Sequence, residues 1–304
     1  MKIPIKIKSY FKRPTRKSVK RFLKNCLLGV LVLIFAMLLG ISVRVFLLAS
    51  FVIPTWSMSP TIMPGDFVMI NKQIPGPRIF KSWDFLNGDF TMKRLGGYRK
   101  IRRNEVIVFN FPYSNHYKLD LDFNVFYAKR CVAVAGDTFY IDNGIYRVKN
   151  CCDTLGYYEN QLKVSQMESE QDAKSGTWNC FPYDTVYYKW NIKNFGPLYV
   201  PAANDTLSID SLNIKLYKNL IEYETSQEIS VVNGTVLLGG DTLNRYIFLK
   251  NYYFVTGDYA PDSHDSRYWG LLPEDHIAGK AFIIWKSQDR NTGKYNWKRF
   301  FKSL

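Results

Sequence analysis

Residues 51–72 read Phe51-Val-Ile-Pro-Thr-Trp-Ser-Met-Ser-Pro-Thr-Ile-Met-Pro-Gly-Asp-Phe-Val-Met-Ile-Asn-Lys72, directly after a long apolar segment. The pattern predicts a strand, an exposed turn and a second strand, because Pro54 and Pro60 lack the N–H that a helix interior or a central strand needs. If the piece between the prolines is extended, the hydroxyls of Thr55 and Ser57 point the same way. These residues alone also fit a plain polar turn, so their role depends on later stretches.

The composition favours an exported β protein over a nucleic-acid-binding one. The 304 residues are 47% hydrophobic and 16% aromatic, with 21 Tyr and 21 Phe, which favours sheet over helix. The net charge is +15, but residues 1–24 carry ten Lys and Arg and no acid, so the other 280 residues carry only +5. No helix-turn-helix, zinc-finger or RNP-type pattern appears, so we expect no nucleic-acid partner.

An apolar segment near the N-terminus predicts one transmembrane helix. Cys26–Val43 is 18 residues without a charge, which span about 27 Å as a helix. Arg44 interrupts the apolar run near its end, where an arginine can snorkel to the interface. A cleavable signal peptide is the alternative, but its apolar core is normally shorter and an Ala-x-Ala site is missing. We therefore expect an uncleaved anchor at 25–49, preceded by a basic cytoplasmic tail at 1–24 and followed by an exported part at 50–304.

The exported part is predicted to be mainly β. Apolar, β-favouring runs predict strands within 103–112, 124–134, 246–255 and 277–285. Asn143-Gly144 and Asn233-Gly234 each separate two such runs, which predicts two hairpins. No long amphipathic helix is expected.

Two regions interrupt this pattern. Residues 73–98 are rich in Gly, Pro and aromatic residues and predict a long loop. Residues 149–227 are more polar and are expected to be an inserted subdomain, with a short surface helix within 163–174. The β core would then consist of 50–148 and 228–304.

The cysteines leave their pairing open. Cys131, Cys151, Cys152 and Cys180 would face an oxidising space outside the membrane, where disulfides can persist, but the adjacent pair also permits free thiols. No C-x-x-C motif is present, and the chain has only three histidines, so we expect no metal site.

A serine in an exposed turn suggests acyl transfer, which requires a general base. His116 is expected to be solvated, and His276 is expected on a surface turn. His264 stands beside Asp265, but the chain has no Gly-x-Ser-x-Gly elbow to partner them. A lysine can serve instead if burial lowers its pKa, and Lys129 lies in the apolar run Val125-Phe-Tyr-Ala-Lys-Arg-Cys-Val-Ala-Val134. A lysine that snorkels at a sheet edge is the commoner alternative.

Four motifs occur in order after the anchor. They are Ser57 within Ser-Met-x-Pro-Thr, Gly65-Asp-Phe67, Lys129-Arg130 followed by Gly136-Asp137, and Gly257-Asp258 followed by Asp262-Ser-His-Asp-Ser-Arg-Tyr-Trp-Gly270. Together with Arg44-Val-Phe46 near the end of the anchor, this order resembles the type I signal peptidase family, the membrane-anchored Ser/Lys proteases. The resemblance implies an antiparallel β catalytic core with an inserted segment.

The resemblance also implies catalytic roles. Ser57 would be the nucleophile and Lys129 the general base. Thr55 falls where the family has a Ser or Thr whose hydroxyl joins the Ser57 backbone N–H in the oxyanion hole. Neither role requires a metal or a cofactor.

Supporting roles are implied for the last motif. Ser263 matches a serine that hydrogen-bonds the lysine and positions it, and Asp265 and Arg267 match a salt bridge that stiffens the loop. Two departures stand out. Trp56 replaces the usual small residue before the nucleophile, and Tyr259-Ala260 replaces the usual Asn-Arg pair after Gly-Asp.

Substrate is expected to lie as an added strand between the Ser57 and Lys129 segments, over two shallow pockets. The apolar residues expected at or near these pockets are Phe51, Ile53, Met58, Ile62 and Ala128. Ordinary core packing is the alternative for all five. Shallow pockets would fit the small residues at −1 and −3 that the family implies.

The sequence therefore predicts a signal peptidase I, a serine endopeptidase that removes N-terminal signal peptides from exported preproteins at the outer face of the inner, cytoplasmic membrane. Membrane lipid and the secretion machinery would be its neighbours. Three rival hypotheses stay open. They are an inactive peptide-binding or scaffold relative, a self-cleaving Ser/Lys regulator, and a Ser-His-Asp hydrolase that uses His264.

Overall fold

The computed structural model describes residues 16–80, 92–113 and 118–304, and the chain divides into two compact units, Met1–Val45 and Phe46–Leu304. The first unit contains α1 (Arg16–Ser42), and a π-helical turn, Val43–Leu47, continues this helix across the boundary between the units. Its apolar stretch Val19–Leu47 is 29 residues long and exposes its side chains. At about 1.5 Å per residue such a helix is long enough to cross a bilayer, so it fits a single-pass membrane anchor.

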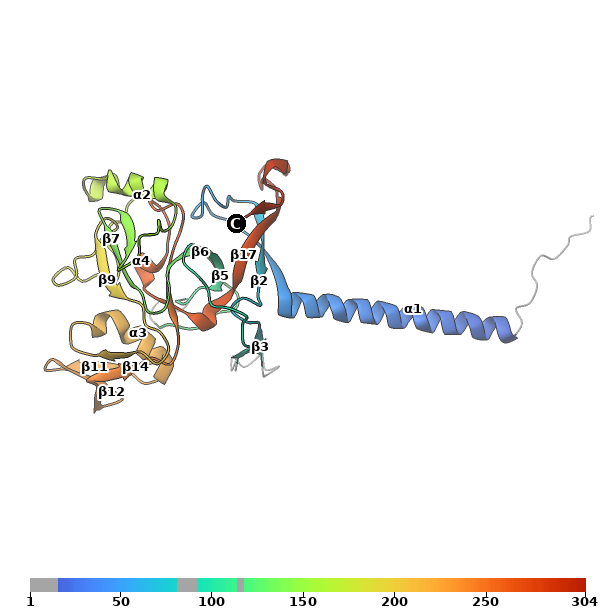
Figure 1. Cartoon of the computed structure of the whole chain (residues 1–304), viewed down its shortest axis with the longest axis horizontal. Helices are drawn as coiled ribbons and strands as arrows, with labels where there is room; N and C mark the ends of the chain where they lie inside the picture. Colours follow the sequence, from blue (N-terminus) through green and yellow to red (C-terminus); the bar gives the residue numbers. More distant parts are fainter. Residues whose placement is uncertain (1–15, 81–91, 114–117) are drawn as a thin grey trace, which may run out of the picture. The chain divides into compact units, whose positions relative to one another are not determined.

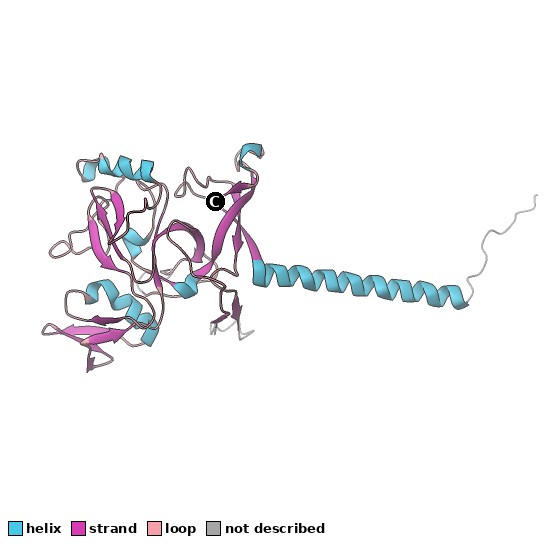
Figure 2. Cartoon of the chain, viewed as in Figure 1, coloured by secondary structure: helices cyan, strands magenta, loops and turns pink. Residues whose placement is uncertain are grey.

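The second unit is mainly β, as Figure 2 shows by the predominance of magenta ribbon after the long helix. Its largest sheet is antiparallel, with strands in the order β1-β2-β17-β5-β6-β15-β16, and β18 pairs with β17. These strands are β1 (Leu48–Val52), β2 (Asp66–Asn71), β5 (Val106–Asn110), β6 (Phe126–Ala133), β15 (Tyr252–Thr256), β16 (Leu272–Pro273), β17 (Ile277–Ser287) and β18 (Lys302–Ser303). In Figure 1, β2 and β17 lie side by side, and β5 and β6 follow. The strands predicted within 103–112, 124–134 and 277–285 belong to this sheet, as does the second half of the one predicted within 246–255.

Two apolar cores lie against this sheet. The smaller core contains residues from β2, β5 and β17 and also Met58 and Ile62 from the connection between β1 and β2. The larger core includes the fully buried strand β15 and the inner residues of the smaller sheets. Because burial of a Met or Ile side chain contributes about 2 kcal/mol, Met58 and Ile62 hold the β1–β2 connection firmly against the sheet.

Smaller sheets flank the main one. A second sheet has the order β8-β7-β9, and two further ones combine β10 with β14 and β11 with β12 and β13. Their bounds are β7 (Thr138–Asp142), β8 (Ile145–Val148), β9 (Phe195–Tyr199), β10 (Thr206–Ser208), β11 (Ile229–Val232), β12 (Thr235–Leu238), β13 (Asp241–Thr242) and β14 (Arg245–Ile247). The hairpins predicted at Asn143-Gly144 and Asn233-Gly234 are confirmed as β7–β8 and β11–β12. All four of these residues adopt the positive φ that such two-residue turns require.

The helices of this unit are short. They are α2 (Tyr158–Ser165), α3 (Ile214–Thr225) and α4 (Ser266–Trp269), with 3₁₀ turns η2 (Glu170–Asp172), η3 (Glu274–His276) and η4 (Trp297–Arg299). The longest of them, α3, has 12 residues and is amphipathic, because it buries Ile214, Tyr217 and Ile221 on one face. The surface helix expected within 163–174 begins earlier, at Tyr158, and gives way to η2.

Three other expectations require correction. Residues 73–98 are not simply a loop, because β3 (Arg78–Phe80) pairs with β4 (Met92–Arg94), and 81–91 lie outside the described residues. The strand expected at 246–255 is interrupted between β14 and β15. His276 is fully buried, where its ring bonds the Asp120 carbonyl oxygen. His116, expected to be solvated, also lies outside the described residues.

The expected insertion shares sheets with the segments on both sides of it. Within 149–227, β9 pairs with β7 from the preceding segment, and β10 pairs with β14 from the following one. The domain boundaries given above therefore stay a prediction. All five cysteines are free thiols in the structure, and Cys131 and Cys180 are buried.

Candidate active site

Ser57 lies on a tight turn between β1 and β2. The turn is closed by backbone bonds from Ser59 N–H to the Trp56 carbonyl (2.8 Å) and from Ile62 N–H to the Met58 carbonyl (2.9 Å). The piece between the prolines is thus curled rather than extended. Met58 and Ile62, four residues apart, both point into the core and have no exposed surface, which leaves Ser57 on the outer side.

The C-terminal segment also secures this turn. Arg299 of η4 forms an ion pair with buried Asp66 (Nη2 to Oδ2, 2.6 Å) and donates to the Thr61 carbonyl (2.9 Å). Asp66 in turn accepts from the Met63 N–H (2.8 Å). We did not predict a role for Arg299, because its partners lie more than 200 positions away and only its place in a basic tail marks it.

Lys129 lies on β6, which is separated from β2 in the sheet by β17 and β5, and its side chain reaches Ser57. Its Nζ lies 2.6 Å from Ser57 Oγ, and its side chain is only 4% exposed. Burial lowers the pKa of Lys129 to about 8, although the Asp265 carboxylate raises it, and the Arg267 guanidinium adds to the lowering. An amine with such a pKa is neutral in a useful fraction near neutral pH, so it can accept a proton from the serine.

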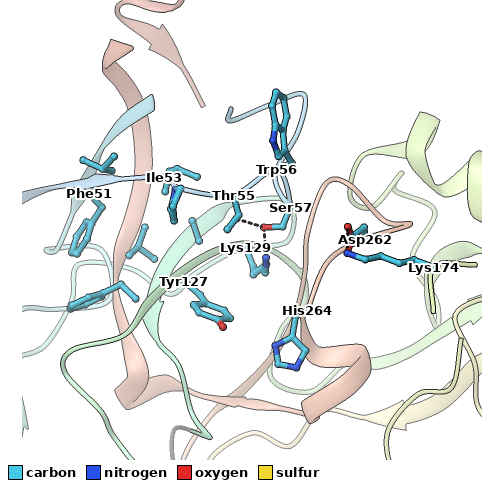
Figure 3. A pocket seen from close by; sticks show the side chains of 15 residues that line it. Phe51, Ile53, Thr55, Trp56, Ser57, Tyr127, Lys129, Lys174, Asp262 and His264 are labelled. Atoms are coloured by element: carbon cyan, nitrogen blue, oxygen red, sulfur yellow. Dashed lines mark hydrogen bonds and ion pairs between the residues drawn. The ribbon is translucent and has the colours of Figure 1, made fainter. Parts of the chain in front are cut away.

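Thr55 stands on the other side of the serine hydroxyl. Its Oγ1 lies 3.3 Å from Ser57 Oγ, and the two hydroxyls point the same way although the backbone is not extended. Figure 3 shows Thr55, Ser57 and Lys129 converging at one point of the cleft.

These three residues lie in a cleft of about 530 Å³. One end is apolar and is lined by Phe51, Ile53, Val108, Phe126 and Ala128. The other end is polar and is lined by His264 and by the ion pair of Lys174 and Asp262 (2.7 Å). In Figure 3, Ser57 and Lys129 lie between the two ends, so a bound chain would have one apolar and one polar half.

Comparison with known proteins identifies the family of this chain. The family model for signal peptidases, peptidase S26, matches residues 26–286. The chain belongs to the signal peptidase family. It is a serine endopeptidase with signal peptidase function and a mainly β fold.

Similar curated proteins span several bacterial groups. The chain is 28% identical to a signal peptidase I of Buchnera aphidicola from Acyrthosiphon pisum, over 83% of this chain and 73% of that protein. It is 24% identical to the signal peptidase I of Aquifex aeolicus, over 81% and 78%. The signal peptidase I of Haemophilus influenzae is 26% identical, over 86% and 71%.

Within this signal peptidase, Asp265 and Arg267 form a fully buried ion pair behind the cleft. Arg267 Nε and Nη2 lie 2.8 and 2.9 Å from the two Asp265 oxygens. Burial alone would raise the pKa of Asp265, but the guanidinium and its hydrogen bonds hold it below the usual value. Arg267 Nη1 also donates to the Ala260 carbonyl (2.9 Å), and Asp265 accepts from the Gly257 N–H (2.9 Å). The pair thereby fixes both ends of the loop that follows β15.

Ser263 does not make the hydrogen bond that the family resemblance implies. Its Oγ is buried and has no hydrogen-bond partner among the residues that the structure describes. It packs closely on Gly257, where an added Cβ would lie 2.1 Å from Ser263 Oγ and 2.4 Å from the Ser57 carbonyl oxygen. Glycine is therefore the only residue type that fits at position 257. The positioning role of Ser263 stays a prediction.

The residues expected to line the substrate pockets divide into two groups. Phe51, Ile53 and Ala128 line the cleft. Met58 and Ile62 were expected there but belong to the core beneath it, because the curled turn directs both inward. The sequence interpretation did not assign other lining residues to the pockets, among them Val52, Val108, Phe126 and Tyr127 at the apolar end and Lys174 at the polar end. Alternation would have pointed from Ala128 to Phe126 on the same face of the strand, but not to Tyr127, which is next to it.

Trp56, the unusual residue before Ser57, stands at the rim of the cleft. Its side chain is 61% exposed and points away from Lys129 (Figure 3). The Trp56 side chain therefore does not obstruct the contact between Ser57 and Lys129.

His264 is not arranged as a base for Ser57. Its ring packs against those of Phe111 (5.6 Å between centroids) and Tyr268 (6.0 Å). Within 16–80, 92–113 and 118–304, no hydrogen bond joins it to Ser57, and the Asp265 carboxylate that could orient it is bound to Arg267. Burial lowers the pKa of His264 below its usual value. No group of His, Cys, Asp and Glu residues in these ranges could hold a metal ion.

Proposed function

We propose that Ser57 and Lys129 are the catalytic dyad of this signal peptidase, and that it cleaves signal peptides from exported preproteins at the outer face of the cytoplasmic membrane. The observation that carries the proposal is the 2.6 Å contact between Ser57 Oγ and the buried amine of Lys129. A serine hydroxyl is a weak nucleophile, and an adjacent neutral amine provides the base that it needs.

The proposed reaction runs in two halves. Neutral Lys129 accepts the Ser57 proton while Ser57 Oγ attacks the scissile carbonyl, and the resulting ammonium then protonates the leaving amine. Water attacks the acyl-enzyme in the second half, with Lys129 again accepting a proton and Ser57 regaining one. Thr55 Oγ1 and the Ser57 N–H would donate to the oxyanion in both halves.

The lining of the cleft fits a peptide with small, apolar side chains on the N-terminal side of the cleaved bond. Phe51, Ile53 and Ala128 line the apolar end, and we expect them to accept small side chains at −1 and −3. We propose that the signal peptide occupies this end and that the mature chain leaves past Lys174 and Asp262.

Membrane placement is part of the proposal. The ten cations of residues 1–24 favour a cytoplasmic N-terminus, so the unit Phe46–Leu304 would face the outside. There it would meet preproteins as they leave the secretion machinery, with membrane lipid close by.

The test is cleavage of a model preprotein in liposomes by the wild type and by Ser57→Ala, Lys129→Ala and His264→Ala. We expect the wild type and His264→Ala to cleave after a small residue, and the other two variants to be inactive. If all four bind the peptide and none cleaves it, the protein is a peptide-binding relative. Activity that survives Lys129→Ala and disappears in His264→Ala would replace the dyad with a histidine mechanism.

A further inference from the structure

Asn160 is a buried polar residue in α2, within the segment 149–227 to which no motif assigns a role. Its side chain is 3% exposed, and its Nδ2 donates to two carbonyls, those of Ser59 (3.1 Å) and Asp258 (2.8 Å). Its Oδ1 accepts from Lys163 Nζ (2.8 Å). Both donor hydrogens and the acceptor are therefore used, and both carbonyls lie about 100 positions away in the sequence.

The two carbonyls belong to the two loops that surround the proposed dyad. Ser59 lies in the turn that carries Ser57. Asp258 begins the loop that continues to Ser263 and Asp265, behind Lys129. Asn160 thus joins the nucleophile turn directly to the loop that supports the base.

Asp258 is also tied to the strand of the base. Its carboxylate forms a two-pronged ion pair with Arg130, the residue after Lys129 on β6 (Nε to Oδ1, 2.6 Å; Nη2 to Oδ2, 2.5 Å). Arg130 Nη2 lies 3.3 Å from Thr61 Oγ1, in the turn of the nucleophile. The side chain of Asp258 is therefore fixed by β6 and its carbonyl by α2.

Other contacts support the same junction. The Tyr259 N–H donates to the Ser57 carbonyl (3.0 Å), and Lys163 Nζ lies 5.6 Å from the centre of the Tyr259 ring. Lys174 pairs with Asp262 farther along the loop. This loop carries Tyr259-Ala260 instead of the Asn-Arg pair expected from the family pattern, and Asn160 supplies an amide to it from another part of the chain.

We infer that Asn160 is a positioning residue for the Ser57–Lys129 dyad, and that it keeps the nucleophile turn and the loop behind the base at a fixed separation. This inference rests on the proposed function. Its physical basis is that proton transfer and attack need close, aligned groups, and a displacement of about 1 Å can lower the rate about 100-fold. Loss of Asn160 would leave the apolar lining around Phe51 and Ile53 intact, so substrate binding would persist.

The chain offers a matched control in the next residue. Gln161 is 1% exposed and also uses both atoms of its amide, with Nε2 donating to the Leu155 carbonyl (2.6 Å) and Oε1 accepting from the Tyr146 N–H (2.9 Å). These partners tie α2 to β8 and to its own preceding loop, not to the loops around Ser57. A change at Gln161 therefore removes two hydrogen bonds of a buried amide from the same helix, against three at Asn160.

The experiment compares Asn160→Ala with Gln161→Ala, and Asn160→Asp with Gln161→Glu, in the full-length enzyme. Steady-state cleavage of a model preprotein gives kcat and KM, and thermal unfolding gives the folded fraction by which kcat is corrected. We expect both Asn160 variants to lose at least about tenfold in kcat with KM changed less than about threefold. The Gln161 variants should keep kcat within about twofold, whatever they lose in Tm.

Equal loss of kcat at the two positions, or a loss at Asn160 that is confined to KM, would overturn the inference. Asn160→Asp keeps the shape of the side chain and carries the test if Asn160→Ala does not fold. Wild type and Ser57→Ala are measured in parallel. If Ser57→Ala stays active, the proposed dyad itself fails, which is a different result from an active Asn160→Ala.

Discussion

At the scale of single residues, the buried amine of Lys129 lowers the stability of the folded protein, and the proposed chemistry requires that burial. Burial lowers its pKa from 10.5 to about 8, so below pH 8 the folded protein holds an ammonium in a poorly solvated place. The unfolded chain keeps a pKa near 10.5. The resulting penalty is fully present below pH 8 and disappears as the pH rises to about 10.5.

We therefore expect Lys129→Met to be inactive yet more stable than wild type at pH 7. The difference between the pKa of Lys129 in the unfolded and in the folded chain corresponds to about 3 kcal/mol of destabilisation. Loss of the hydrogen bond to Ser57 costs about 1 kcal/mol, so the free energy of unfolding should rise by about 2 kcal/mol. Urea unfolding at pH 7 and pH 11 measures it, and the gain should vanish at the higher pH. A variant less stable than wild type at pH 7 would show that Lys129 is not strained by burial.

Thr55 provides a second prediction at this scale. Thr55→Val keeps the side-chain shape and removes the hydroxyl proposed to bind the oxyanion. Because such a donor acts in the transition state, kcat should fall by about 100- to 1,000-fold with KM unchanged. Thr55 is exposed, so Tm should stay the same. Thr55→Ser should retain most of the activity, and a fully active Thr55→Val would remove this residue from the mechanism.

At the scale of elements, the buried pair of Asp265 and Arg267 fixes α4 and the loop before it. Removing one partner leaves the other charge buried, which costs about 3–5 kcal/mol. Asp265→Ala should therefore destabilise the protein by that amount in urea unfolding. The double variant Asp265→Leu with Arg267→Met should lose much less, since no charge is left unpaired. Equal losses in the single and double variants would mean that the pair acts through shape, not charge.

Elements specified by local chemistry were predictable from the sequence. The Asn143-Gly144 and Asn233-Gly234 turns are examples, because their positive φ depends on the two turn residues alone. The curled turn at Ser57 was not predictable, since it depends on burial of Met58 and Ile62 against β2, β5 and β17. Assuming an extended backbone there gave the wrong surroundings for both residues.

In the candidate site, too, some features were predictable from the sequence and others were not. The pairing of Ser57 with Lys129 was predicted from motif order, and their atoms do meet in the structure. The roles of Asn160 and Arg299 could not be found from sequence, because each joins segments about 100 or more positions apart through hydrogen bonds to backbone carbonyls or to one carboxylate. Any residue type can supply a backbone carbonyl, so it leaves no signal in the sequence.

At the scale of the whole molecule, the proposed orientation can be tested through a native cysteine. In the unit Phe46–Leu304, Cys152 is an exposed free thiol and Cys151 a partly exposed one, whereas Cys131 and Cys180 are buried. In right-side-out membrane vesicles treated with an impermeant reductant, an impermeant maleimide should label Cys152 without permeabilisation. The double variant Cys151→Ser with Cys152→Ser is the control, because Cys151 is also partly exposed. Labelling only after permeabilisation would place this unit on the cytoplasmic side.

The central claim is that buried Lys129, and not His264, is the base for Ser57, and the pH dependence of kcat/KM tests it most directly. A base must be neutral, so activity falls as the pH drops below its pKa. With Lys129, the acid limb should have its midpoint near pH 8. Because burial lowers the pKa of His264 below its usual value of 6.5, a histidine base would place the midpoint of the acid limb below that pH. A midpoint near pH 8 supports the account, and a midpoint below 6.5 contradicts it.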